Sequence, residues 1–349
     1  MLCSTITYPQ FVITPENLLQ FVYRSGISGD GGTQLAEYRS GSWYNIGSWA
    51  SSSGTYTAPS GAKSLARNLY IHGFTYGSSR AHVTGTWREQ SGNVTCNNGG
   101  LTNHDTIYLY SEDEGECQTT PREASAPVIL GRRRLIPFKI GRTWKNSAGL
   151  TVGTSGSKPV SVSAAGIIID SLDADHGLMN QESQAVDSSG LIHAIISYVP
   201  GKRCIVDSKT DTEIFPYIGR FTQCVTNYVE DRISYGRPFH LYKTSNGTFV
   251  KIEIPVPLNS VGRSQIVMDN SDNVYVVLPY VRIVSASRSS SWTDWTVVYD
   301  GVADGLNAFG EVTVDRARVS TGVLSVLYQQ KSSGTTPSPV QLIDFRLNA

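Results

Sequence analysis

Short segments in which apolar and polar positions alternate recur along the whole chain, separated by turns rich in Gly, Asp, Ser and Asn. This period of two is typical of half-buried β-strands, and no long run has the i, i+3, i+4, i+7 apolar spacing of an amphipathic helix. The predicted strand pairs are 10–13 with 18–23, 80–87 with 106–110, 185–186 with 192–198, 264–268 with 274–279, and 311–314 with 323–329; two further strands cover 166–169 and 248–254.

The same pattern indicates how these strands assemble. Many short strands joined by regular turns point to a sandwich, a barrel or a propeller. Where the repeat can be followed, its spacing is about 50 residues, which favours blades of four strands. We therefore predict an all-β fold, a β-propeller of four-stranded blades, built as a single domain over residues 1–349.

The composition excludes two classes of partner. The chain carries 29 basic and 29 acidic side chains, so it has no basic excess to neutralise nucleic-acid phosphates. No apolar stretch approaches the roughly 18 residues that a membrane helix needs. The first residues lack the basic and apolar regions of a signal peptide, so no export signal is visible in this chain.

The five cysteines form no C-x-x-C pair, which excludes zinc ribbons and thioredoxin-type redox sites. Cys96 with Cys117, and Cys204 with Cys224, could close short loops in an oxidising compartment. Free buried thiols explain the same residues equally well, so both readings stay open.

One turn motif is interrupted. Residues 111–115 read SEDEG, the first half of an Asp-box, the Ser-x-Asp-x-Gly-x-x-Trp hairpin turn of sialidase-like propellers, and residues 141–144 supply its second half, GRTW. The segment between them lacks strand alternation. We expect residues 116–140 to be a disordered insertion within this hairpin, or else untranslated sequence retained in the gene model.

Three stretches carry a family resemblance: YPQFV at residues 8–12 with FVYRSG at 21–26; IHGFTY at 71–76 with RAHVTGTWRE at 80–89 and NHD at 103–105; and NQESQAVD at 180–187. Together they resemble the Asp-box (BNR-repeat) propellers of polysaccharide lyases that act on uronic acids. The fungal L-rhamnose-α-1,4-D-glucuronate lyases are the most similar group, and ulvan lyases are more distant.

The resemblance has several implications. Relatives are extracellular and seven-bladed, with blade sequence before the Tyr-Pro strand, so we expect an N-terminally incomplete ring of about five to six blades. The implied partner is a uronic-acid-containing polysaccharide, and the implied assembly is a monomer. No organic cofactor is expected, and the resemblance allows a structural calcium ion on the propeller axis.

Eliminating a 4-linked uronic acid requires a group that neutralises the carboxylate, a base for the C5 proton and an acid for the departing O4. By resemblance, His82 and His104 form a catalytic pair that supplies the base and the carboxylate-binding group, with Asp105 orienting His104. We assign Tyr242 as the acid and Arg263 as the carboxylate neutraliser. The residues that we expect to bind substrate are His72, Tyr76, Trp87, Arg88, Asn180, Gln181 and His240.

Two other functions remain open. The first is a glycoside hydrolase, rhamnosidase- or sialidase-like, on the same propeller, because a fold does not fix its chemistry. The second is a propeller that binds carbohydrate without turnover. A serine-hydrolase elbow and a phosphate-binding loop are both absent from the sequence.

Overall fold

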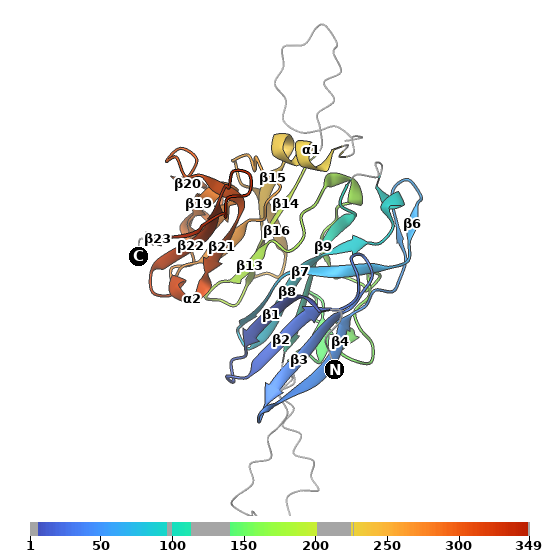
Figure 1. The fold of residues 1–349 in the computed structure, drawn as a ribbon. Helices are drawn as coiled ribbons and strands as arrows, with labels where there is room; N and C mark the ends of the chain where they lie inside the picture. The colour runs from blue at the N-terminus through green and yellow to red at the C-terminus, as the bar shows by residue number, and fades with distance from the viewer. Residues whose placement is uncertain (1–5, 96–99, 113–139, 201–224, 226, 348–349) are drawn as a thin grey trace, which may run out of the picture.

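The computed structural model describes residues 6–95, 100–112, 140–200, 225 and 227–347, shown as a ribbon in Figure 1. The four cysteines of the two candidate pairs, Cys96, Cys117, Cys204 and Cys224, lie outside the described residues. So does the expected insertion up to residue 139. The disulfide pairing and the insertion therefore stay predictions.

The described strands form five main antiparallel sheets, arranged as the blades of a propeller and numbered in chain order. Blade 1 contains β1 (Thr7–Ile13), β2 (Leu19–Arg24), β3 (Thr33–Arg39) and β4 (Ser42–Ala50). Blade 2 contains β7 (Arg67–Gly77), β8 (Arg80–Glu89), β9 (Asn103–Glu112), β10 (Thr143–Lys145) and β11 (Thr151–Thr154), with β12 (Ile168–Asp170) paired to β9.

Blade 3 contains β13 (Ser183–Val186), β14 (Ile192–Tyr198), β15 (Arg237–Lys243) and β16 (Phe249–Glu253). Blade 4 contains β17 (Gln265–Met268), β18 (Val274–Leu278), β19 (Arg282–Ala286) and β20 (Thr296–Asp300). Blade 5 contains β21 (Ala308–Asp315), β22 (Val323–Gln330) and β23 (Val340–Arg346). The smaller elements are β5 (Tyr56–Thr57), β6 (Lys63–Ser64), α1 (Tyr228–Tyr235), α2 (Arg316–Val319), and the 3₁₀ turns η1 (Gly92–Val94), η2 (Ala174–His176), η3 (Pro279–Val281) and η4 (Arg288–Ser290).

The first strand of each blade lies innermost. β1 packs against β7, β7 against β13, β13 against β17, and β17 against β21, so these strands surround a common axis. All of them begin at the same end of that axis, which we call the entry end. The propeller prediction is confirmed, and each of the five predicted strand pairs appears as an antiparallel hairpin.

The helix α1 was not anticipated from the sequence. It is only eight residues long, and the Asn227 side chain caps it by accepting a hydrogen bond from the Glu230 N–H. An Asn followed three residues later by Glu resembles a capping box, but eight residues give too few turns for a helical apolar period to be visible. α1 covers the entry end of blade 3 (Figure 1).

The two halves of the interrupted Asp-box lie side by side. The Gly141 N–H donates to Ser111 Oγ at 2.7 Å, and the Trp144 side chain is completely buried. Trp144 stacks on Trp49 of β4 with 4.5 Å between ring centroids, which joins blades 1 and 2 in one apolar core. The motif thus stabilises the fold and carries no chemistry of its own.

Gln184 of β13 joins blade 3 to blade 2. Its Oε1 accepts from the Thr84 N–H at 2.8 Å and the Thr84 hydroxyl at 2.7 Å, while its Nε2 donates to Thr75 Oγ1 at 3.0 Å and His82 O at 2.9 Å. A Cβ atom on Gly73 would lie 2.6 Å from Gln184 Cγ, so only glycine leaves room for this side chain. Gln184 is therefore a buried contact between the two blades.

We expect Gln184→Leu to lower the free energy of unfolding by about 2–4 kcal/mol, because it leaves buried donors and acceptors on blade 2 without partners. Urea unfolding followed by tryptophan fluorescence measures this loss. Gln341→Leu, at an exposed position of β23, is the matched control and should change stability by less than about 0.5 kcal/mol. Equal effects of the two substitutions would contradict the role of Gln184.

Candidate functional site

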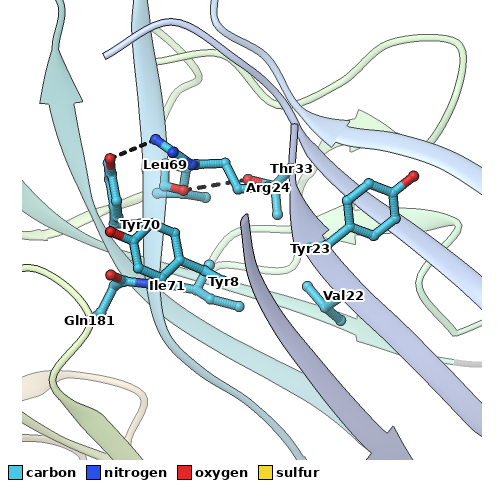
Figure 2. A pocket seen from close by; sticks show the side chains of 9 residues that line it. All are labelled: Tyr8, Val22, Tyr23, Arg24, Thr33, Leu69, Tyr70, Ile71 and Gln181. Carbon is cyan, nitrogen blue, oxygen red and sulfur yellow. Dashed lines mark hydrogen bonds between the residues drawn. The ribbon is translucent and has the colours of Figure 1, made fainter. Parts of the chain in front are cut away.

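A small open pocket lies at the entry end between blades 1 and 2. Figure 2 shows the nine residues that line it: Tyr8, Val22, Tyr23, Arg24, Thr33, Leu69, Tyr70, Ile71 and Gln181. They come from the start of β1, the end of β2, the start of β3, the start of β7 and the turn before β13. None of the nine is Asp or Glu.

Arg24 is the most interconnected side chain of the pocket. It is buried, and its guanidinium donates to the Tyr70 hydroxyl at 2.6 Å (Figure 2) and to Asn68 Oδ1 at 2.9 Å. It also lies 5.2 Å from the ring centroid of Tyr8 and 4.8 Å from that of Tyr70. Because Arg24 is the donor in the bond to Tyr70, the hydroxyl hydrogen of Tyr70 is left to point elsewhere.

Arg88 approaches Tyr70 as well. It is half-buried at the end of β8, next to Asn68 across the strand pair, and its guanidinium lies 5.9 Å from the Tyr70 ring centroid. Within the described part of the chain, neither Arg24 nor Arg88 has a carboxylate at ion-pair distance. A cation held out of water with neutral partners is costly and gains most from an incoming anion.

Asn180, Gln181 and Arg263 extend the site toward blades 3 to 5. Gln181 faces the pocket with a left-handed backbone, φ 55°. Its neighbour Asn180 accepts from Arg263 through its backbone O at 2.9 Å and its Oδ1 at 3.2 Å. Arg263 also pairs with Glu311 of β21, so this arginine already has a carboxylate partner.

Tyr228 of α1 faces the same end of the molecule. Burial raises the pKa of its phenol, while the positive charges of Arg232, Arg263 and Arg88 partly oppose that rise. Tyr228 thus lies within electrostatic range of Arg88 and of Arg263. Its hydroxyl contacts the Met179 sulfur at 3.8 Å.

The structure does not bring His82 and His104 together. They lie on the neighbouring strands β8 and β9, but His82 is opposite Tyr110 and His104 is opposite Trp87. Five residues of β8 separate these positions, which corresponds to about 16 Å along the strand. A pair acting together on one sugar ring does not fit this geometry.

Both histidines are also enclosed. His82 is buried, with Nδ1 at 2.8 Å from the Tyr108 hydroxyl and Nε2 at 3.2 Å from Gly77 O, and burial lowers its pKa to about 4. His104 is completely buried, with one ring nitrogen facing Asp105 and the other facing Glu89. Neither ring has a nitrogen open to a substrate.

Three of the expected substrate-binding residues lie away from the pocket, and two of them, Trp87 and His72, are in the protein interior. Trp87 is completely buried in the core between blades 1 and 2. His72 is buried on β7, where its Nδ1 accepts from the Glu182 N–H at 3.0 Å and burial lowers its pKa to about 3. The Tyr76 hydroxyl donates to Gln20 Oε1 at 2.5 Å, near the opposite end of β7 from the pocket.

Tyr242 and His240 lie inside blade 3. His240 is completely buried, and its Nε2 lies 2.9 Å from Nδ1 of His193. Burial and the neighbouring His193 hold the pKa of His240 well below its usual range. Tyr242 stacks on both rings, and its hydroxyl donates to Ser291 O at 3.3 Å, toward the end of the axis away from the pocket. Strand alternation cannot distinguish these interior positions from exposed ones, because both faces of a blade are covered.

Sequence reasoning missed Tyr8, Arg24 and Tyr70. All three sit within or next to the stretches that carry the family resemblance, and Arg24 directly follows the predicted strand 18–23. A polar residue directly after a predicted strand, as at Arg24, was the available signal. Its meaning depends on which strands meet at the axis, and that is decided only by the fold.

The described residues contain no group of three or more His, Cys, Asp or Glu side chains arranged as metal ligands. The structure therefore names no ligands for the calcium ion that the resemblance allows. No helix in the described ranges is both long and apolar enough to cross a membrane.

Comparisons with known proteins agree with this architecture. A family model described as BNR repeat-containing family member matches residues 2–132 and 136–256. The solved structure of polysaccharide lyase Uly1 is similar with a TM-score of 0.56 and 16% identity, covering 98% of this chain and 58% of that one. No curated protein sequence matches the chain.

A second solved structure, a PL25 ulvan lyase bound to -[GlcA(1-4)Rha3S]-, has a TM-score of 0.57 and 12% identity, covering 97% of this chain and 64% of that one. At these identities the similarity establishes the propeller fold. The chain spans about three fifths of the length of both structures.

We expect the protein to lose stability as the pH falls from about 6.5 to about 4.5. His72, His82 and His240 have pKa values lowered by burial, so the unfolded chain binds protons in this window that the folded chain does not. Each such group contributes a slope approaching about 1.4 kcal/mol per pH unit. Urea unfolding at pH 7, 6 and 5 measures the sum.

His72→Asn is the informative variant, because the amide oxygen keeps the hydrogen bond from Glu182 N–H but does not titrate. Its stability should fall less steeply with pH than that of the wild type. The control is His176→Asn, which changes a partly exposed ring. Equal pH slopes for His72→Asn and the wild type would contradict the assignment.

Proposed function

Because the chain belongs to the BNR repeat-containing family and folds as a propeller, we propose that it is a polysaccharide lyase that cleaves a uronate linkage by β-elimination. The two similar solved structures are polysaccharide lyases. That similarity supports the proposal. Its main evidence is the chemistry of the pocket.

The carrying observation is that Arg24 and Arg88 approach one phenol, Tyr70, and have no carboxylate partner among the described residues. An arginine fork matches a carboxylate in shape and charge. A uronate carboxylate supplies the missing anion, and once bound its charge is neutralised, which makes the C5 proton acidic enough to remove.

The pocket lining also favours a lyase over a glycoside hydrolase. Ordinary glycoside hydrolysis uses a pair of carboxyl groups, about 5–9 Å apart, on either side of the scissile bond. The nine lining residues include no Asp or Glu. A tyrosine with an available hydroxyl hydrogen and two guanidiniums suits proton transfer beside an anion.

In the proposed reaction, Arg88 binds the uronate carboxylate and Arg24 fixes the Tyr70 oxygen through their 2.6 Å hydrogen bond. The C5–H bond breaks and its proton passes to the Tyr70 oxygen. The C4–O4 bond breaks, a C4=C5 double bond forms, and the Tyr70 hydroxyl hydrogen goes to O4. Tyr70 ends the cycle as it began, and Gln181 orients the sugar at the pocket wall.

We propose a glucuronate–rhamnose or similar uronate linkage as the substrate. The support is the sequence resemblance described above, together with the GlcA-Rha3S fragment that the PL25 ulvan lyase binds. Because such polymers are found outside cells, we also propose an extracellular site of action.

We expect the chain to release an unsaturated uronate when it is incubated with gum arabic side chains or with ulvan. A rise in ultraviolet absorbance measures this product. Tyr70→Phe removes the proton-transfer group and should lower kcat by about 10²–10⁴-fold. Tyr44→Phe, at an exposed position of β4, is the control and should leave the rate unchanged.

Release of reducing sugar without the absorbance rise would identify a hydrolase instead. Binding without any turnover would identify a non-catalytic carbohydrate-binding propeller. Either result from folded protein contradicts the lyase proposal.

Arg88→Gln should lower kcat/KM by about 10–100-fold, because it removes one charge-assisted contact to the substrate carboxylate. Initial rates over a range of substrate concentrations measure this loss. The matched control is Arg346→Gln on the outermost strand β23. On a substrate whose uronate is methyl-esterified, Arg88→Gln and the wild type should have the same kcat/KM. A difference in kcat/KM that persists on this substrate would refute the carboxylate contact.

A further inference from the structure

Three strands of blade 2 share a buried cluster of charges near the pocket. Arg67 at the start of β7 donates to Glu89 at the end of β8 through Nε at 2.7 Å and Nη2 at 3.0 Å. His104 at the start of β9 lies 3.0 Å from the same Glu89 carboxylate through Nε2. All three side chains have 0% exposure.

The second nitrogen of His104 also meets a carboxylate. Nδ1 lies 3.0 Å from Asp105 Oδ2, and the ring stacks on Tyr56 with 3.8 Å between centroids. An imidazole that donates to two carboxylates must carry both protons and therefore a positive charge. Arg67 and His104 then balance Glu89 and Asp105, whereas a neutral His104 leaves one negative charge in excess at a buried site.

This cluster lies directly behind the pocket residues. Asn68 and Arg88 follow Arg67 and precede Glu89 on the same two strands, and they pair with each other across β7 and β8. Because successive side chains of a strand point to opposite faces, the charge cluster occupies one face and Asn68 and Arg88 occupy the other. Asn68 in turn accepts from Arg24 at 2.9 Å.

We propose that His104 is a positioning residue, an imidazolium cation that locks the ends of β7, β8 and β9 and so holds Asn68 and Arg88 at the pocket. It acts through Glu89 and Asp105 and does not touch the substrate. The part that concerns substrate rests on the proposed lyase function; the part that concerns the charge of His104 does not.

The charge has a definite pH dependence. Burial alone lowers the pKa of His104, but the hydrogen bonds and negative charges of Asp105 and Glu89 outweigh burial and leave the pKa raised. A raised histidine pKa stabilises the fold fully below the unfolded value of about 6.5, and this stability is lost as the pH rises through the folded pKa. The other groups around the ring are Arg67 and the Tyr56 phenol, and Asp173 and Asp175 lie near that phenol.

Asp105→Asn separates the charge from the hydrogen bonds. The amide oxygen can still accept from the Leu172 N–H, as Asp105 Oδ1 does at 2.9 Å, while the amide nitrogen donates to a neutral His104. Asparagine also tolerates the left-handed backbone of this position, φ 47°. The variant therefore keeps the contacts and removes the cation.

The first test is nitrogen-15 NMR of the histidines in the full chain, with His104 assigned from the spectrum of His104→Gln. We expect both His104 nitrogens to be protonated at pH 7 in the wild type and only one in Asp105→Asn. A singly protonated His104 in the wild type at pH 7 would overturn the proposal. Because the wild-type result does not depend on a spectrum of Asp105→Asn, it decides the question even if that variant does not fold.

The second test is amide hydrogen exchange at residues 67–69, 87–89 and 103–105, corrected for the intrinsic effect of pH. Protection in the wild type should fall about tenfold or more per pH unit above the folded pKa. Protection in Asp105→Asn should not depend on pH in this range. The control Asp173→Asn removes a nearby carboxylate without changing a bond to His104, and it should behave as the wild type. Equal pH dependence of this protection in the wild type and in Asp105→Asn would overturn the proposal that the His104 cation holds the ends of these strands together.

The lyase assay tests whether the charge of His104 affects substrate binding through Arg88. We expect the KM of the wild type to rise by about tenfold as the pH rises through the folded pKa of His104, because Arg88 is displaced, while kcat changes less and the KM of Asp105→Asn shows no such rise. An unchanged KM would overturn the positioning of Arg88. A chain with no elimination activity at all refutes the lyase function, and the NMR and exchange results still decide the charge of His104.

Discussion

The position of β13 against β7 is the constraint on which the site depends. Gln184 enters blade 2 beside Gly73 and satisfies two donors and two acceptors there. An amide side chain buried between two sheets fits only one register, because a shift of one residue would turn it to the other face. The turn before β13 is thereby fixed, and with it Gln181 at the pocket wall.

The entry end contains two groups of buried or half-buried charges. One group is paired with opposite charges, and the other is not. Arg67, Glu89, His104 and Asp105 form a set whose charges cancel, which suits a rigid support. Arg24 is buried among neutral partners, and half-buried Arg88 has no carboxylate partner in the described ranges. A compensated cluster behind an uncompensated pair keeps the guanidiniums in place while leaving their charge for a ligand.

Histidines illustrate why the site could not be assigned from the chain alone. His82 stands in the predicted strand 80–87 and His104 stands two residues before the predicted strand 106–110, so the sequence pattern assigns both to one blade. In the structure both lie on its strands, β8 and β9. Pairing places them at opposite ends of that blade, with every ring nitrogen engaged by neighbours. Arg24 followed a predicted strand and Tyr70 lay outside every predicted strand, and their meaning became visible only when the fold brought β2 and β7 together.

The sequence by itself determined the five predicted strand pairs and the propeller class, because these follow from local alternation, turn residues and the repeat length. Other strands, such as β7 and β15, were not predicted from it. It also determined that the two halves of the Asp-box belong together. Only the tertiary structure decided which residues face the pocket, since the inner strands come from segments far apart in the chain. The charge of His104 is decided there too, because it is set by Glu89 and Asp105 acting together in a buried site and not by the identity of the residue.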